Sequence, residues 1–137
     1  MTTVTAGAMP ISTLVSDRAI RIRSEASLSE VAVAMNEADI GLLVLGSDGE
    51  PAEAVVSERD LVRALAEGRD PDVTTAREIA HLELAWCDAG ATVTEVAAEM
   101  MENYVRHVLV EEDGRLVGIV SVRDLLGAYV AADLSAI

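Results

Sequence analysis

The sequence predicts an α/β fold made of two similar units, each with the element order β-α-β-β-α. Three observations predict it: an internal repeat, apolar residues at helical spacing behind helix-start signals, and short β-rich runs separated by turn dipeptides. With 137 residues, 51% of them hydrophobic, the chain is long enough to bury a core without disulfides. We expect the two units to be related by a pseudo-twofold axis and to pack through their sheets into one module.

The repeat is visible when the chain is compared with itself at an offset of 65 residues. Of 36 aligned positions 14 are identical, against about 3 expected by chance. Residues 26–49 lie over 91–114 and, after a gap of one residue, residues 54–65 lie over 118–129.

Each copy is expected to begin with a strand, at residues 20–22 and 85–87, and to continue with a helix. Ser27 and Thr92 precede Glu30 and Glu95 by three residues, which is the spacing of a capping box at a helix start. Apolar residues then recur at i, i+3, i+4 and i+7, which predicts one buried stripe on each helix. The stripes are Leu28, Val31, Ala32 and Met35, and Val93, Val96, Ala97 and Met100.

A hairpin and a second helix are expected to complete each copy. The turn dipeptides Asp48-Gly49 and Asp113-Gly114 lie between short β-rich runs. Those runs are residues 42–45 and 54–56 in the first copy, and 108–110 and 118–120 in the second. The second helices begin near Ser57 and Ser121 and include Leu61 and Leu65, or Leu125, Leu126 and Val130.

The stretch between the copies contains Gly68, Pro71 and mixed charges, which end the preceding helix. We therefore expect domains at residues 9–66 and 76–132, with residues 67–75 as a short linker.

Composition and charge exclude several classes of protein. The net charge is −14 and all ten basic residues are scattered arginines, so the chain is a poor ligand for nucleic acid. No apolar stretch is long enough to span a bilayer and the start lacks a signal-peptide pattern, so we expect a cytoplasmic protein without membrane contact. Abundant Ala, Val and Arg without Lys is typical of a GC-rich bacterial genome.

No motif predicts catalysis or a metal site. The chain has no glycine-rich phosphate loop with its lysine and no Gly-x-Ser-x-Gly elbow, so we expect a protein that is not an enzyme. The single Cys87 is expected to be a small core residue, and His81 and His107 lack further ligands at metal-binding spacing.

The segment GIVSVRD, residues 118–124, and its first-copy counterpart AVVSERD, residues 54–60, resemble the signature of the cystathionine β-synthase-type (CBS) domain. The resemblance extends from about residue 11 to residue 129 and implies a tandem pair, called a Bateman module. It implies that adenosine-containing ligands bind in the cleft between the two domains: AMP, ADP, ATP, S-adenosylmethionine or NAD(H). It further implies regulation without any required cofactor, the ligand shifting the relative arrangement of the halves, which a protein partner recognises.

The resemblance also implies roles for individual residues. A carboxylate at a helix start can accept two hydrogen bonds from a ribose diol, and a hydroxyl with helix N-terminal amides can hold phosphate. Asp60 and Asp124 would bind ribose, and Ser57 and Ser121 would bind phosphate. The second copy is expected to hold the better site, comprising Gly118, Ser121, Arg123, Asp124, Arg106, His107 and Trp86, whereas the first copy offers Ser57, Arg59, Asp60 and Gly41.

Alternatives remain open for these residues. Each Ser and Asp pair also has the spacing of a plain capping box, and Arg59 and Arg123 have the character of surface ion-pair residues. Trp86 would either stack on an adenine or plug the pocket. The competing function is a ligand-free scaffold for protein interaction or dimerisation.

The apolar composition of residues 61–66 and 125–132 suits helix packing between copies. We therefore expect a homodimer, with a nucleotide as the small-molecule partner and an additional protein partner.

Overall fold

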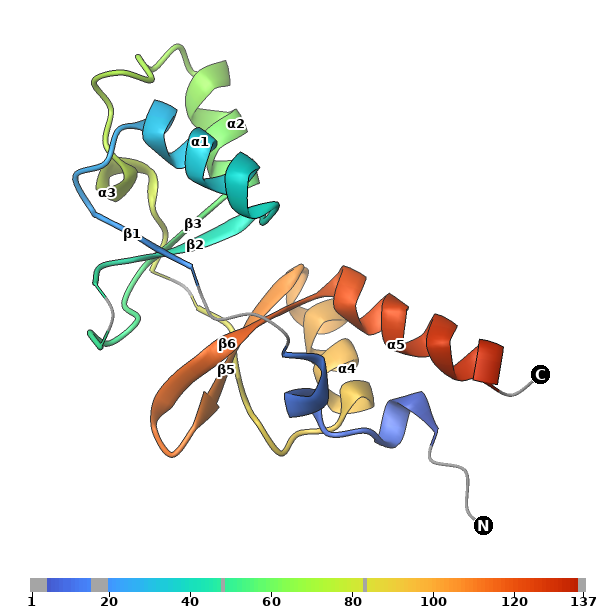
Figure 1. Ribbon diagram of the computed structural model, residues 1–137. Coiled ribbons are helices and arrows are strands. Elements are labelled where there is room, and N and C mark those ends of the chain that lie inside the picture. Colours follow the sequence, from blue (N-terminus) through green and yellow to red (C-terminus); the bar gives the residue numbers. More distant parts are fainter. Residues whose placement is uncertain (1–4, 16–19, 48, 83, 136–137) are drawn as a thin grey trace. The chain divides into compact units, whose positions relative to one another are not determined.

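The computed structural model describes residues 5–15, 20–47, 49–82 and 84–135, and the side chains up to residue 133 (Figure 1). The chain forms two compact units. The first unit is Ala19–Leu84, and the second unit combines Ala85–Ile137 with Met1–Arg18.

The first unit contains one three-stranded sheet. Strand β1 lies beside β2 in parallel, and β3 pairs with β2 in the antiparallel direction. This arrangement confirms the predicted β-α-β-β-α order and adds the unpredicted short helix α3. In chain order the elements are β1 (Arg21–Ile22), α1 (Leu28–Ala38), β2 (Leu42–Leu45), β3 (Val55–Ser57), α2 (Glu58–Ala66) and α3 (Ala76–Ile79).

The second unit repeats this topology, with β4 parallel to β5 and β6 antiparallel to β5. Two short 3-10 helices from the start of the chain belong to it and were not predicted. Its elements are η1 (Ala6–Ala8), η2 (Ile11–Leu14), β4 (Trp86–Asp88), α4 (Val93–Asn103), β5 (His107–Glu112), β6 (Arg115–Ser121) and α5 (Val122–Ser135).

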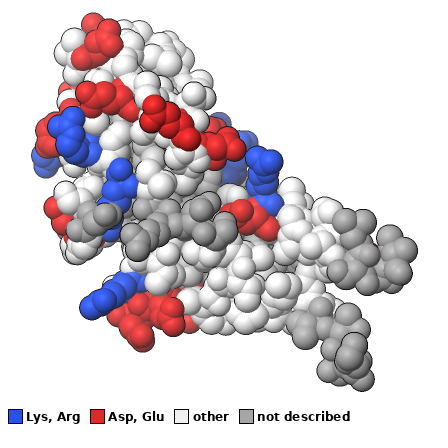
Figure 2. Space-filling model, viewed as in Figure 1, with Lys and Arg blue, Asp and Glu red and all other residues white. Residues whose placement is uncertain are grey.

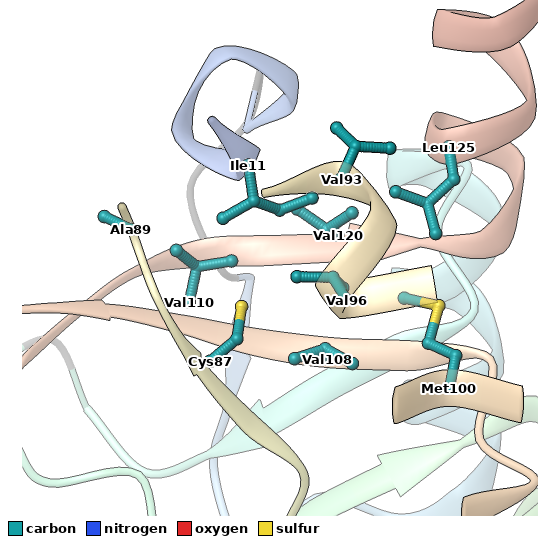
Figure 3. Close-up of a cluster of buried hydrophobic side chains, with 10 residues drawn as sticks. All are labelled: Ile11, Cys87, Ala89, Val93, Val96, Met100, Val108, Val110, Val120 and Leu125. Carbon is teal, nitrogen blue, oxygen red and sulfur yellow. The ribbon is translucent and has the colours of Figure 1, made fainter. Parts of the chain in front are cut away.

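Each unit has its own hydrophobic core between its sheet and its first long helix. In the first unit Leu28, Val31 and Met35 of α1 are buried as predicted, but Ala32 is exposed because it lies outside the face that meets the sheet. The core of the second unit combines α4 with alternate residues of the strands (Figure 3). It consists of Ile11, Cys87, Ala89, Val93, Val96, Met100, Val108, Val110, Val120 and Leu125.

The segment before each copy of the repeat packs on the unit formed by the other copy. Ile11 is fully buried against α4 of the second unit, and its N–H donates to the Ala91 carbonyl at 2.7 Å. Ala76 is fully buried in the first unit, and its N–H donates to the Ala26 carbonyl at 2.7 Å. Because Ile11 and Ala76 are 65 positions apart, as are Ala26 and Ala91, the two contacts obey the internal repeat.

The stretch expected to link the copies also packs on the first unit. The Leu28 N–H donates to the Thr74 carbonyl at 3.0 Å and the Ser29 N–H donates to the Pro71 carbonyl at 3.0 Å. Helix α3 then begins after Thr75, whose N–H donates to the Glu78 carboxylate at 2.7 Å. This hydrogen bond lowers the pKa of Glu78.

The predicted helix starts form at Ser27 and Thr92, with one difference. The Thr92 hydroxyl accepts from the Glu95 N–H while the Glu95 carboxylate accepts from the Thr92 N–H, which completes the capping box. The Ser27 hydroxyl accepts from the Glu30 N–H in the same way, but the Glu30 carboxylate binds the Arg23 guanidinium at 3.2 Å. This ion pair replaces the hydrogen bond from the Ser27 N–H to the Glu30 carboxylate that would complete the capping box.

The two predicted hairpin turns differ in length. Asp113 (φ 53°) and Gly114 (φ 77°) join β5 directly to β6, as predicted. In the first unit a longer connection joins β2, which ends at Leu45, to β3, which begins at Val55. Asp48 of the predicted turn lies outside the described residues, whereas Gly49 has the positive φ of 89° that favours glycine. The antiparallel pairing is thus confirmed in both units.

None of the helices in the described ranges combines the length and the apolar character needed to cross a bilayer.

Candidate functional site

The candidate site of the second unit lies where β6 passes into α5. The Asp124 Oδ2 accepts hydrogen bonds from the Ser121 N–H at 2.8 Å and from the Ser121 hydroxyl at 3.0 Å. The Asp124 N–H in turn donates to the Ser121 Oγ at 3.2 Å. The pair therefore makes a capping box, which fixes the carboxylate at the amino end of the helix.

Two further predicted residues share the sheet face of Ser121. Val108, Val120 and Cys87 point into the helix-covered core, and neighbouring residues of a strand point to opposite faces. Trp86 and His107 therefore lie on the other face, together with Ser121. His107 is directly opposite Ser121 in the strand register, and Trp86 pairs with Leu109. Trp86 and His107 are both half-buried.

Arg106 is brought to the same helix start by the backbone, because the Val122 N–H donates to the Arg106 carbonyl at 2.9 Å. The side chains of Arg106 and Arg123 are exposed. Gly118 is not brought to this place. It has the parity of Val120 along β6, so it lies on the helix-covered face opposite Val110.

In the first unit the same junction joins β3 to α2. The Asp60 Oδ2 accepts from the Ser57 N–H at 2.8 Å and from the Ser57 hydroxyl at 2.9 Å, and the Ser57 Oγ accepts from the Asp60 N–H at 3.2 Å. Asp60 is only 8% exposed. A third contact to Oδ2 comes from the His81 Nδ1 at 2.8 Å, and the Arg63 guanidinium lies 3.9 Å from Oδ1.

Gly41 takes the place of Arg106 in this unit. Its carbonyl accepts from the Glu58 N–H at 3.0 Å, so it too lies beside the helix start. A Cβ on Gly41 would meet the carboxyl group of Glu58, with Cδ at 3.0 Å and Oε1 at 3.1 Å. The Arg59 side chain is exposed.

Sequence reasoning missed the two residues that set the first unit apart, His81 and Glu58. His81 is 21 positions from Asp60, and its backbone reaches β3 through reciprocal hydrogen bonds with Val55 at 3.0 and 3.1 Å. No local pattern predicts that pairing. Glu58 could have been found, because the repeat aligns it with the uncharged Val122.

Both helix starts have groups that suit a polyol or an anion, although in the first unit His81 and Glu58 lie beside them. Each offers a fixed carboxylate that accepts hydroxyl hydrogen bonds, beside helix N-terminal amides that favour negative charge. Cys87 of β4 is buried as predicted. Burial raises the pKa of its thiol to about 11, so this thiol is a poor nucleophile at neutral pH. In the described ranges no three side chains of His, Cys, Asp or Glu lie together as metal ligands.

Comparison with protein families matches the pattern described as "CBS domain" twice, at residues 11–67 and 76–131. Hypoxic response protein 1 of Mycobacterium tuberculosis is 38% identical over 100 residues, which is 72% of this chain and 70% of that protein.

Two solved structures are similar along most of the chain. The CBS domain protein from Pyrobaculum aerophilum complexed with AMP is 31% identical, with a TM-score of 0.76 over 90% of this chain and 100% of that one. The structure of Hypoxic Response Protein I with two coordinated zinc ions is 32% identical, with a TM-score of 0.70 over 87% of this chain and 98% of that one.

Proposed function

The chain belongs to the CBS-domain family, and from this membership and the geometry of its helix starts we propose that it is a regulatory module that binds an adenosine-containing ligand. Ligand binding shifts the population of conformations that a protein partner recognises, without any chemical turnover. The observation that carries the proposal is the strand-to-helix junction of the second unit, where the Asp124 carboxylate is held beside helix N-terminal amides and Arg106.

The residues of this junction match the parts of a nucleotide. The Asp124 Oδ2 is occupied by its own cap, and its other carboxylate oxygen is available to ribose hydroxyls. The first amides of α5 are partly used by the cap, because the Val122 N–H donates to the Arg106 carbonyl and the Asp124 N–H donates to Ser121 Oγ. The Arg123 N–H and the exposed Arg106 side chain would supply a donor and positive charge for phosphate beside Ser121. Trp86, on the face of Ser121, supplies an aromatic surface for the base.

The similarity to a CBS domain protein complexed with AMP makes AMP the first ligand to test. ADP, ATP, S-adenosylmethionine and NAD(H) contain the same adenosine group, and the geometry of the cap is compatible with each of them.

We also propose that the module is a homodimer. Apolar side chains remain exposed on α5, where Leu126 is 59% and Val130 is 57% exposed, and on α2, where Val62 is 65% exposed. In Figure 2 the surface over α5 and the 3-10 helices is largely free of charged residues. Uncharged helix faces of this kind are buried in stable dimers.

One observation favours the competing function of a ligand-free scaffold. Both Ser and Asp pairs form complete caps without any ligand, so the start of each second helix is satisfied by its own residues. In that case Trp86 fills the space that a base would occupy.

Thermal unfolding with each nucleotide separates the two functions, because a ligand that binds only the folded state raises its stability. The variants Asp124→Ala and Asp60→Ala form a matched pair. Each removes one capping box, at a cost of about 1 kcal/mol, and Asp60→Ala also removes the contacts to His81 and Arg63. Only Asp124→Ala removes the proposed ribose contact.

We expect AMP to raise the unfolding temperature of the wild-type protein and of Asp60→Ala. The unfolding temperature of Asp124→Ala should be the same with and without AMP. No shift with any of the five ligands in the folded protein would favour the scaffold. A Trp86→Ala variant that gains binding would identify Trp86 as a plug, whereas loss of binding would identify it as the base platform.

A further inference from the structure

We infer that the first unit is closed to nucleotides by its own side chains, Glu58 and His81, so that one chain binds one nucleotide. The inference rests on the proposed function and adds two residues that determine which unit is used.

Glu58 places negative charge at the position where a phosphate would bind. It is the first residue of α2, and its carboxyl group lies within 3.3 Å of the point that a Gly41 Cβ would occupy. The helix N-terminus that would attract an anion thus already has a carboxylate beside it. A phosphate there would meet like charge at short range, and repulsion at such a separation is strong near a protein surface.

His81 occupies the ribose acceptor of the same unit. The Asp60 Oδ2 receives contacts from the Ser57 N–H, the Ser57 hydroxyl and the His81 Nδ1, all within 2.9 Å, although a carboxylate oxygen has only two lone pairs. The remaining Oδ1 lies 3.9 Å from Arg63. His81 is held in place by its backbone pairing with Val55, so a ribose diol must displace an anchored side chain.

The second unit differs at each of these positions. Val122 aligns with Glu58, so an uncharged side chain stands where the first unit has a negative one. Arg106 aligns with Gly41, so a positive side chain stands where the first unit has no side chain. The counterpart of His81 in the repeat is Ser16, which lies outside the described residues. At these two aligned positions the first unit is therefore negative and the second unit positive.

Isothermal titration with AMP measures the number of sites per chain and their affinity. We expect about one AMP per wild-type chain and about two per chain of the double variant Glu58→Val/His81→Ala. The reciprocal variant Val122→Glu copies the first unit into the second and should weaken AMP binding at least about tenfold. Glu58→Val alone serves if the double variant does not fold, with circular dichroism as the check on folding, and it should show a second, weaker site.

The outcomes separate this inference from the proposed function. Two AMP per wild-type chain, or an unchanged affinity in Val122→Glu, would overturn the role of Glu58 while leaving nucleotide binding intact. One AMP bound by the double variant and none by the wild type would overturn the second unit as the nucleotide site but support the closure of the first. No binding to any of these proteins would overturn both.

Discussion

Replacing Ile11 with alanine tests whether the start of the chain is part of the second unit. Ile11 is fully buried among Val93, Val96 and Val120, as Figure 3 shows, although 80 positions separate it from Ala91, its hydrogen-bond partner. The substitution removes three carbon atoms, at about 0.8 kcal/mol each in transfer free energy. Adding the cavity left behind gives a loss of about 3 kcal/mol, within the range for buried Ile→Ala changes.

For a chain of 137 residues a loss of that size lowers the unfolding temperature by about 10 °C. Calorimetry measures the shift. Val33→Ala is the matched control, because Val33 is an apolar residue on α1 that is 55% exposed and should cost less than about 0.5 kcal/mol.

Hydrogen exchange locates the effect. We expect the amides of α4 to lose protection in Ile11→Ala and those of α1 to keep it. A stability change as small as that of the control, or a loss of protection confined to α1, would refute the assignment of the N-terminal segment to the second unit.

Three further predictions concern single sites. Gly127 lies within α5, and a Cβ added to it would have nothing within 4 Å. Gly127→Ala should therefore raise the free energy of unfolding, measured by chemical denaturation, by about 0.5–1 kcal/mol. A decrease would mean that a neighbour covers this position. Tyr104 ends α4 in the left-handed backbone conformation, with φ 54°, and its side chain is 96% exposed. Tyr104→Gly should stabilise the protein by about 1 kcal/mol, because glycine adopts this conformation without strain. Destabilisation would show that the tyrosine ring makes a contact. Because burial raises the pKa of Cys87 to about 11, the folded state holds this proton more tightly than the unfolded state, and its contribution to stability should be lost as pH rises from about 9 to 11. Unfolding curves of wild type and Cys87→Ala that fall in parallel over that range would contradict this.

Much of the fold could be predicted because the helix-start and turn signals are local and the repeat presents most of them twice. Strand β2 has the predicted bounds, and α4 begins at the predicted capping box of Thr92 and Glu95. The 3-10 helices were missed because Ile11 is buried by contacts with a segment far away in sequence. Helix α3 was missed although Thr75 and Glu78 have the spacing of a helix start, because its four residues are too few for a periodic pattern.

The site was predictable where it follows the repeat and not where it depends on tertiary pairing. Ser121 with Asp124, and Ser57 with Asp60, interact as their spacing predicts. His81 reaches Asp60 because its backbone pairs with Val55, and no periodic pattern in the sequence predicts that pairing. That pairing and the charge of Glu58 make two units with the same fold chemically different.

A crystal structure of the protein grown with AMP would show which helix start holds the nucleotide. We expect ligand density in the second unit, with the ribose on Asp124 and the phosphate near Ser121 and Arg106. Density beside Ser57 and Asp60 alone would contradict this expectation.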